Sequence, residues 1–163
     1  MASLSEKDFD CFDGYHHTLM IIMTDRNQGS YLQFVGEYFS SGKRLEENQP
    51  GITGEALDRT HHGEQSIHHY FCNQRKAIAG LSGGMMYIYN GLYLYIGFSN
   101  PLVGCRKCFV ELTLRKESAK WAYEQLDNGE TKTSRHGEWK VEAKYLLSQK
   151  PILNITLGRD YQF

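Results

Sequence analysis

A tight β-hairpin is the feature that most constrains the fold of this chain. Two runs of apolar and aromatic residues, 85–89 and 92–98, meet at Asn90-Gly91. An Asn-Gly pair supplies the two positive φ angles of a type I′ turn, which joins adjacent antiparallel strands. The turn also sets the cross-strand pairs, which we expect to be Tyr89 with Leu92, Ile88 with Tyr93 and Tyr87 with Leu94. Both faces of the hairpin are apolar or aromatic, so it is expected inside a sandwich rather than on a half-solvated sheet.

Weaker patterns predict the remaining elements. Five further segments have the composition of strands, and these are 18–23, 31–39, 108–114, 139–146 and 152–157. One helix is predicted over 118–126, with Ser118 as its N-cap and Asn128-Gly129 as its end. The segment 42–63 is polar and is expected to be a long loop. These elements predict a mainly β protein, a β-sandwich of about eight to ten strands with one or two flanking helices.

The bulk properties fit one globular domain over residues 1–163, with 1–15 as a short N-terminal segment. The chain is 40% hydrophobic and 23% charged, which is ordinary for a globular protein. Its net charge is −1, and it has no basic stripe, so nucleic acid is not an expected partner. No apolar run approaches the roughly 18 residues of a membrane-spanning helix. Residues 1–14 lack the apolar core of a signal peptide, which leaves cytosolic storage open.

Aromatic residues are the one anomaly of the composition. Eleven tyrosines, eight phenylalanines and two tryptophans make up 13% of the chain. Tyrosine-rich strands are common in β-sandwiches, which is the simpler interpretation. The alternative is functional, because tyrosines are amphipathic and suit contact with carbohydrates, lipid headgroups or a membrane interface.

The cysteines and histidines do not predict a metal or redox site. Cys105 and Cys108 have CxxC spacing, but no second CxxC completes a zinc site, and the pair leads into a strand rather than a helix. Ordinary thiols are expected at these positions, and at Cys11 and Cys72. The paired histidines, His16-His17, His61-His62 and His68-His69, are expected on solvated loops. No catalytic motif is present, so we expect no enzyme activity, no metal and no cofactor.

Several short motifs follow one another in a characteristic order. They are Glu37-Tyr38-Phe39-Ser40-Ser41-Gly42, Gly80-Leu81-Ser82-Gly83, Ser99-Asn100-Pro101, Tyr123-Glu124, Gly137-Glu138-Trp139 and Ile152-Leu153-Asn154-Ile155. In this order, over residues 18–157, the chain resembles the actinoporins, the pore-forming cytolysins of sea anemones and their relatives in other animals. The resemblance implies a β-sandwich flanked by helices. Fungal fruit-body lectins share that fold and bind sugars instead, so fold alone does not decide function.

The resemblance also implies a headgroup site. The family's phosphocholine-binding positions correspond here to Ser41, Ser82, Ser99, Pro101 and Tyr123. Hydroxyls would hold the phosphate, and the tyrosine ring would hold a quaternary ammonium. Two further family tyrosines are replaced by Asp127 and Asn128, and the loop 102–107 lacks aromatic residues but contains Arg106 and Lys107. These two cations favour an anionic headgroup.

Actinoporins insert an amphipathic N-terminal helix into the membrane, and the resemblance assigns that role to Leu4, Phe9 and Phe12. About 15 residues of helix span about 22 Å, less than the roughly 30 Å hydrocarbon core. The first expectation is therefore a membrane-binding, pore-forming protein that oligomerises on membranes, whether secreted or at a target-cell membrane. The alternative is a non-lytic protein of the same fold that binds glycans or lipid headgroups.

Overall fold

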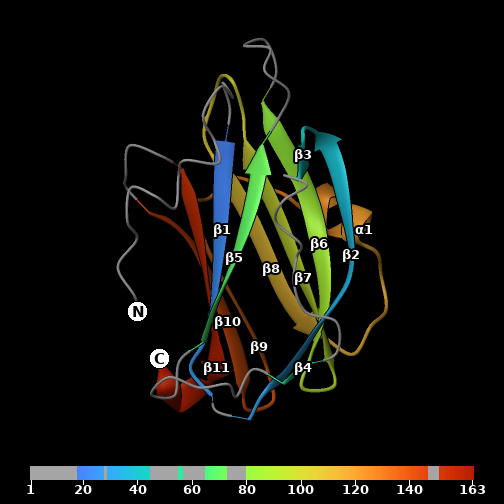
Figure 1. The fold of residues 1–163 in the computed structure, drawn as a ribbon, viewed down its shortest axis with the longest axis vertical. Helices are drawn as coiled ribbons and strands as arrows, with labels where there is room; N and C mark the ends of the chain where they lie inside the picture. Colours follow the sequence, from blue (N-terminus) through green and yellow to red (C-terminus); the bar gives the residue numbers. More distant parts are fainter. Residues whose placement is uncertain (1–17, 28, 45–54, 57–64, 73–79, 147–150) are drawn as a thin grey trace.

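The chain folds into a two-layer β-sandwich (Figure 1). The computed structural model describes residues 18–27, 29–44, 55–56, 65–72, 80–146 and 151–163, of which 55–56 and 65–72 are described by their backbone alone. In chain order the elements are β1 Thr18–Asp25, β2 Tyr31–Ser41, β3 Lys43–Arg44, β4 Glu55–Ala56, β5 Gln65–Cys72, β6 Leu81–Tyr89, β7 Leu92–Asn100, β8 Lys107–Thr113, α1 Ala119–Glu124, β9 Thr131–His136, β10 Trp139–Leu146, β11 Ile152–Arg159 and the 3₁₀ turn η2 Asp160–Gln162.

Two sheets form the layers. One has the order β3-β5-β1-β11-β10-β9, and the other has the order β4-β2-β6-β7-β8. Within these sheets β1 and β11 pair in parallel, whereas the other pairs are antiparallel. Nine of the strands within the described residues have six residues or more, so the predicted sandwich of about eight to ten strands is confirmed.

The predicted hairpin is confirmed as β6 and β7. Asn90 and Gly91 both have positive φ, at 48° and 82°, and Tyr89 pairs with Leu92 as expected. The inward-facing side chains of this hairpin meet those of β1, β10 and β11 in the core between the sheets, where Tyr87, Leu94 and Ile155 are fully buried. Removing this apolar surface from water is the main force that holds the two layers together.

Helix α1 covers the second face of the hairpin (Figure 1). It packs on the side chains of Met86 and Tyr95, and it lies directly on the backbone at two strand positions, Gly84 and Gly97, which pair with each other. A Cβ at Gly84 would lie 2.1 Å from the carbonyl oxygen of Ala119, and one at Gly97 would lie 2.5 Å from that of Ala122. The hairpin therefore has two apolar faces because one faces the core and the other faces this helix.

The helix is shorter than the sequence predicts. Ser118 is the N-cap, as expected, and its hydroxyl accepts a hydrogen bond from the amide of Trp121. The helix ends at Glu124 with Gln125 as its C-cap, two residues before the predicted end at residue 126. The chain leaves the helix because it next pairs with β8, where the carbonyl of Gly129 accepts a hydrogen bond from the amide of Cys108.

Some strands were not predicted. The expected loop 42–63 contains the two short strands β3 and β4, whereas its other residues after Arg44 lie outside the described residues. His68 and His69 lie in β5 rather than on a loop, and β9 has the uniformly polar sequence Thr-Lys-Thr-Ser-Arg-His. Strand β9 lies at the edge of its sheet and shows no buried side chain, so it has no apolar alternation for a sequence pattern to detect.

Candidate functional site at one end of the five-stranded sheet

Three of the predicted site serines line up across neighbouring strands. Ser41 on β2 pairs with Ser82 on β6, and Ser82 pairs with Ser99 on β7. The next strand, β8, continues the line with Lys107 opposite Ser99. Directly opposed residues of antiparallel strands share a face of the sheet. We call Ser41, Ser82 and Ser99 the serine row.

The serine row faces away from the core. Its neighbours along the strands, Leu81, Phe98 and Cys108, are buried between the sheets, and side chains alternate between the two faces of a strand. Ser82, Ser99 and Lys107 therefore lie on the outer face, which is also the face that α1 covers farther along the sheet. All three are partly exposed.

Close backbone contacts fix the edge of the row. The hydroxyl of Ser41 donates to the carbonyl of Gly80 at 2.6 Å. A Cβ at Gly80 would lie 2.9 Å from the Cα of Pro101 and 2.9 Å from the amide nitrogen of Leu102. Only a glycine fits here without displacement, so Gly80 holds the start of the 101–106 loop against the serine row. Ser41 and Pro101 thus both contact Gly80.

A tyrosine of the opposite sheet supports the row from below. Tyr145 on β10 is buried, and its hydroxyl accepts from the amide of Ser99 at 3.3 Å. The same oxygen lies 3.0 Å from the carbonyl of Ser99 and 2.9 Å from that of Lys107, to either of which it can donate. Burial raises the pKa of Tyr145, which keeps the hydroxyl protonated as a donor. Tyr145 was not predicted from the sequence, because no local pattern shows that an inward-facing tyrosine reaches across the core.

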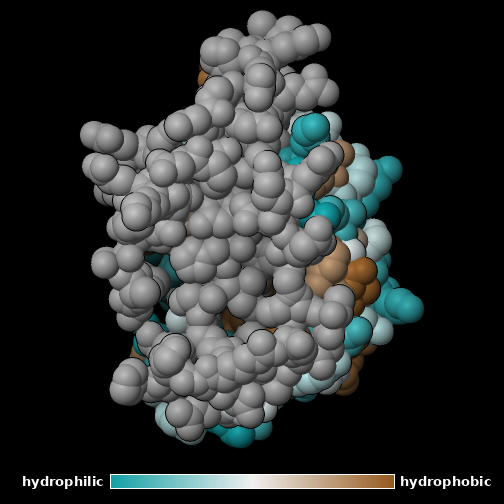
Figure 2. Space-filling view, in the orientation of Figure 1, coloured by the Kyte–Doolittle hydropathy of each residue, from teal (hydrophilic) through white to brown (hydrophobic). Residues whose placement is uncertain are grey.

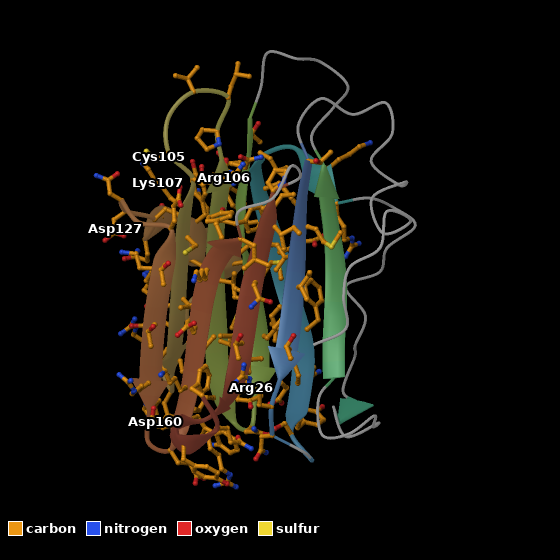
Figure 3. All side chains as sticks on the ribbon, turned by 90° about the vertical axis from the view of Figure 1, so that its left-hand side faces the viewer. Arg26, Cys105, Arg106, Lys107, Asp127 and Asp160 are labelled. Carbon is orange, nitrogen blue, oxygen red and sulfur yellow. The ribbon has the colours of Figure 1, made fainter. Side chains whose placement is uncertain are left out.

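The loop after the serine row has an apolar tip with basic residues behind it. Leu102 is 48% exposed and Val103 is 87% exposed. Arg106 follows, with its guanidinium 6.0 Å from the ring centroid of Tyr145. Figure 3 shows Cys105, Arg106 and Lys107 at one end of the sandwich, with Arg26 and Asp160 at the other. The lack of aromatic residues in this loop is visible in the sequence, whereas the exposure of its two aliphatic residues was not predicted.

Tyr123 borders the row without joining it. It lies on α1, and its ring centroid is 5.6 Å from that of Tyr38. Tyr38 pairs with Gly84, two residues along β6 from Ser82, so the tyrosine pair lies one step nearer the helix. The ammonium of Lys120 lies 5.8 Å from the centroid of the Tyr38 ring. On the side where α1 and β2 lie, Figure 2 shows apolar residues interrupted by hydrophilic ones.

Among the described residues at this end of the molecule, unpaired cations outnumber unpaired carboxylates. Lys43, Arg106, Lys107 and Lys120 make no ion pair with a carboxylate among the described residues, and only two nearby carboxylates, Glu124 and Glu130, are likewise unpaired there. Two other carboxylates of this end are neutralised: Asp127 pairs with Lys132 at 2.5 Å, and Glu37 pairs with Arg44 at 3.4 Å. The unpaired cations give this end an attraction for anions.

The two cysteines of the CxxC motif have opposite environments. Cys105 is exposed on the loop, whereas Cys108 is fully buried, and burial raises the pKa of its thiol to about 12. No group of three potential metal ligands occurs among the described side chains. In the same part of the chain, no helix has the length and apolar character needed to cross a bilayer. The predicted insertion residues, Leu4, Phe9 and Phe12, lie outside the described residues.

Comparison with known proteins identifies the fold. No family model and no curated protein sequence matches the chain. Among solved structures, the lipid binding protein Nakanori is similar at a TM-score of 0.69 and 14% identity, over 87% of this chain and 71% of Nakanori. IP-1A from Alcaligenes faecalis matches at 0.50 and 19% identity, over 90% and 93% of the two chains. The Xerocomus chrysenteron lectin XCL gives 0.48 and 16% identity, over 87% and 97%.

These similarities confirm the fold. The chain shares its fold with Nakanori, a β-sandwich as the resemblance to actinoporins and fungal fruit-body lectins predicts. At such low identity the similarity extends to the fold alone. The function therefore has to be argued from the site.

Proposed function

We propose that this protein binds lipid membranes through the end of the sandwich that carries the serine row and the 101–106 loop. The observation that carries the proposal is the exposure of Leu102 and Val103 beside unpaired cations and hydroxyls. Aliphatic side chains are stabilised at the boundary between the headgroups and the acyl chains of a membrane, whereas Lys and Arg are stabilised beside lipid phosphates. Nakanori, which shares the fold, is a lipid binding protein.

Each group has a defined part in this binding mode. Leu102 and Val103 enter the interface, which places the start of β8 at headgroup depth. Lys107 and Arg106 then lie where the phosphates are. The hydroxyls of Ser82 and Ser99 can donate to phosphate oxygens, and such bonds to a charged acceptor are stronger than neutral ones.

Vesicle flotation with loop variants tests the proposal. The double variant Leu102→Asn with Val103→Asn should bind vesicles about tenfold or more weakly, since each aliphatic side chain contributes roughly 1 kcal/mol when partly buried. Leu114→Asn is the matched control, because Leu114 is also exposed (68%) but follows the far end of β8. Equal binding by all three proteins would remove the loop from the site. Binding to glycans, with no binding to any vesicle, would identify the lectin-like alternative instead.

Pore formation is a further part of the proposal, and the resemblance to actinoporins is what supports it. The full chain should oligomerise on vesicles and release an entrapped dye. A chain lacking residues 1–14 should still float with vesicles but release no dye, because Leu4, Phe9 and Phe12 are the insertion residues that the resemblance implies. Binding without dye release by the full chain would define a non-lytic lipid-binding protein. A secreted protein, or one acting at a target-cell membrane, fits either outcome.

A further inference from the structure

An aromatic pair next to the serine row is already occupied by a cation of the protein itself. The rings of Tyr38 and Tyr123 pack at 5.6 Å, and the ammonium of Lys120 lies 5.8 Å from the Tyr38 centroid. Tyrosine faces beside phosphate-binding hydroxyls are the arrangement that would hold the quaternary ammonium of a choline headgroup. In this protein the ammonium of Lys120 would compete with a choline group for that position.

Local structure places Lys120 at this position. Lys120 and Tyr123 are three residues apart on α1, so they share one side of the helix. The helix is held close to β6 by Gly84, the residue paired with Tyr38, which brings both side chains toward that ring. Glu124 lies one helical turn farther on but makes no ion pair with Lys120. The tethered ammonium therefore faces the aromatic ring without a neutralising carboxylate among the described residues.

We propose that Lys120 sets the headgroup selectivity of the site, by excluding choline and by selecting phosphate headgroups that carry no ammonium group, such as phosphatidylglycerol. This inference rests on the proposed membrane binding and specifies its ligand. A second cation about 6 Å from Lys120 is repelled by a factor of roughly 3 at the dielectric constant of water, and of about 100 at the effective value near a protein surface. A phosphate in the serine row is attracted by Lys120 together with Lys107 and Arg106.

Flotation with two kinds of vesicle measures this selectivity. One is phosphatidylcholine alone, and the other is phosphatidylcholine mixed with phosphatidylglycerol. The parent protein should prefer the mixed vesicles by about tenfold or more. Lys120→Gln should bind pure phosphatidylcholine about tenfold more tightly than the parent and should bind the mixed vesicles less tightly. Lys116→Gln is the control, because it removes the same charge from an exposed lysine that makes no contact with Tyr38.

The outcomes separate this inference from the proposed function. If Lys120→Gln and Lys116→Gln weaken binding equally and neither gains binding to phosphatidylcholine, Lys120 acts only as surface charge and the inference is overturned. A parent that binds both vesicles equally overturns it as well, while the proposed function stands. No vesicle binding by any of the proteins ends the proposed function itself. Inorganic phosphate at matched ionic strength should leave binding unchanged, and displacement would assign the site to free phosphate.

Discussion

Cys105 and Cys108 show how one short motif can hold two unrelated residues. In an extended strand, residues three apart point to opposite faces. Here Cys108 enters the core at the start of β8, while Cys105 stays on the exposed loop. The CxxC spacing therefore joins a surface thiol to a core thiol, which is why it indicates neither a metal ligand pair nor a redox pair.

This difference predicts the reactivity of the two thiols. At pH 8 the Cys108 thiol, with its pKa raised to about 12 by burial, should be alkylated by iodoacetamide on the order of a thousandfold more slowly than Cys105. Because the raised pKa keeps Cys108 almost entirely as a neutral thiol at pH 8, its reaction rate should rise about tenfold with each pH unit and level off only near pH 12. Peptide mass mapping after timed alkylation measures both sites at once. In denaturant the two rates should converge, and comparable rates in the native protein would contradict the buried position.

The serine row could be picked out from the sequence as a set of candidate site residues, whereas the residues that pack around it could not. Ser41, Ser82 and Ser99 stand in motifs that the resemblance recognises, and the structure places them in one line. Tyr145 and Lys120 stand in no such motif. Tyr145 comes from the other sheet, and Lys120 acts through the packing of α1, so both depend on tertiary contacts that a linear pattern does not encode.

At the scale of elements, the close contact between α1 and the β6–β7 hairpin depends on two glycines, Gly84 and Gly97, which have no side chains. Gly84→Ala would place a methyl group 2.1 Å from the carbonyl oxygen of Ala119, so either the helix or the strand must move. Such overpacking should lower the free energy of unfolding by about 1–3 kcal/mol, measurable by urea denaturation. It should also displace the Tyr123 ring from Tyr38, which near-ultraviolet circular dichroism can follow.

Gly36→Ala is the matched control for that variant. Gly36 lies on the adjacent strand β2, and a Cβ there would meet nothing within 4 Å. Its free energy of unfolding should stay the same or rise slightly, because alanine loses less backbone entropy on folding than glycine. Equal destabilisation by the two variants would mean that the helix does not depend on the Gly84 contact.

The elements that could be predicted are those whose side chains alternate or carry a turn signal. The hairpin is the clearest, because Asn90-Gly91 fixes its register locally. Strand β9 and the end of α1 could not be predicted in the same way. Strand β9 lies at the edge of its sheet and shows no apolar alternation. The helix ends before Asn128-Gly129, and Gly129 pairs with β8 instead.

At the scale of the whole molecule, the net charge conceals an uneven distribution. The chain carries −1 overall, yet the end with the 101–106 loop has four unpaired cations among its described residues. Binding to phosphatidylglycerol-containing vesicles should therefore weaken as sodium chloride rises, because the Debye length falls from about 10 Å at 0.1 M to about 3 Å at 1 M. Residual binding at high salt should require Leu102 and Val103.

The melting temperature, measured over the same range of salt, serves as a comparison for vesicle binding. The melting temperature should change little over this range, because the fold is held by a buried apolar core rather than by the exposed ion pairs. Vesicle binding that is independent of salt in both the parent and the loop variant would show that the cations of this end take no part. Composition alone gives the net charge of −1, but it could not show where on the surface the charge lies.

The paired glycines beneath α1, Gly84 and Gly97, also bear on how distant relatives of this protein could be recognised. Sequence identity to Nakanori, which has the same fold, is 14%, so residue-by-residue similarity carries little signal. The close approach of helix to hairpin makes a simpler demand: two small residues at paired strand positions, here Gly84 and Gly97, and Ala119 and Ala122 on the helix above them. Because backbone contact tolerates no bulkier side chain, we expect this four-residue pattern to outlast the surrounding sequence and to serve as a search query where alignment fails.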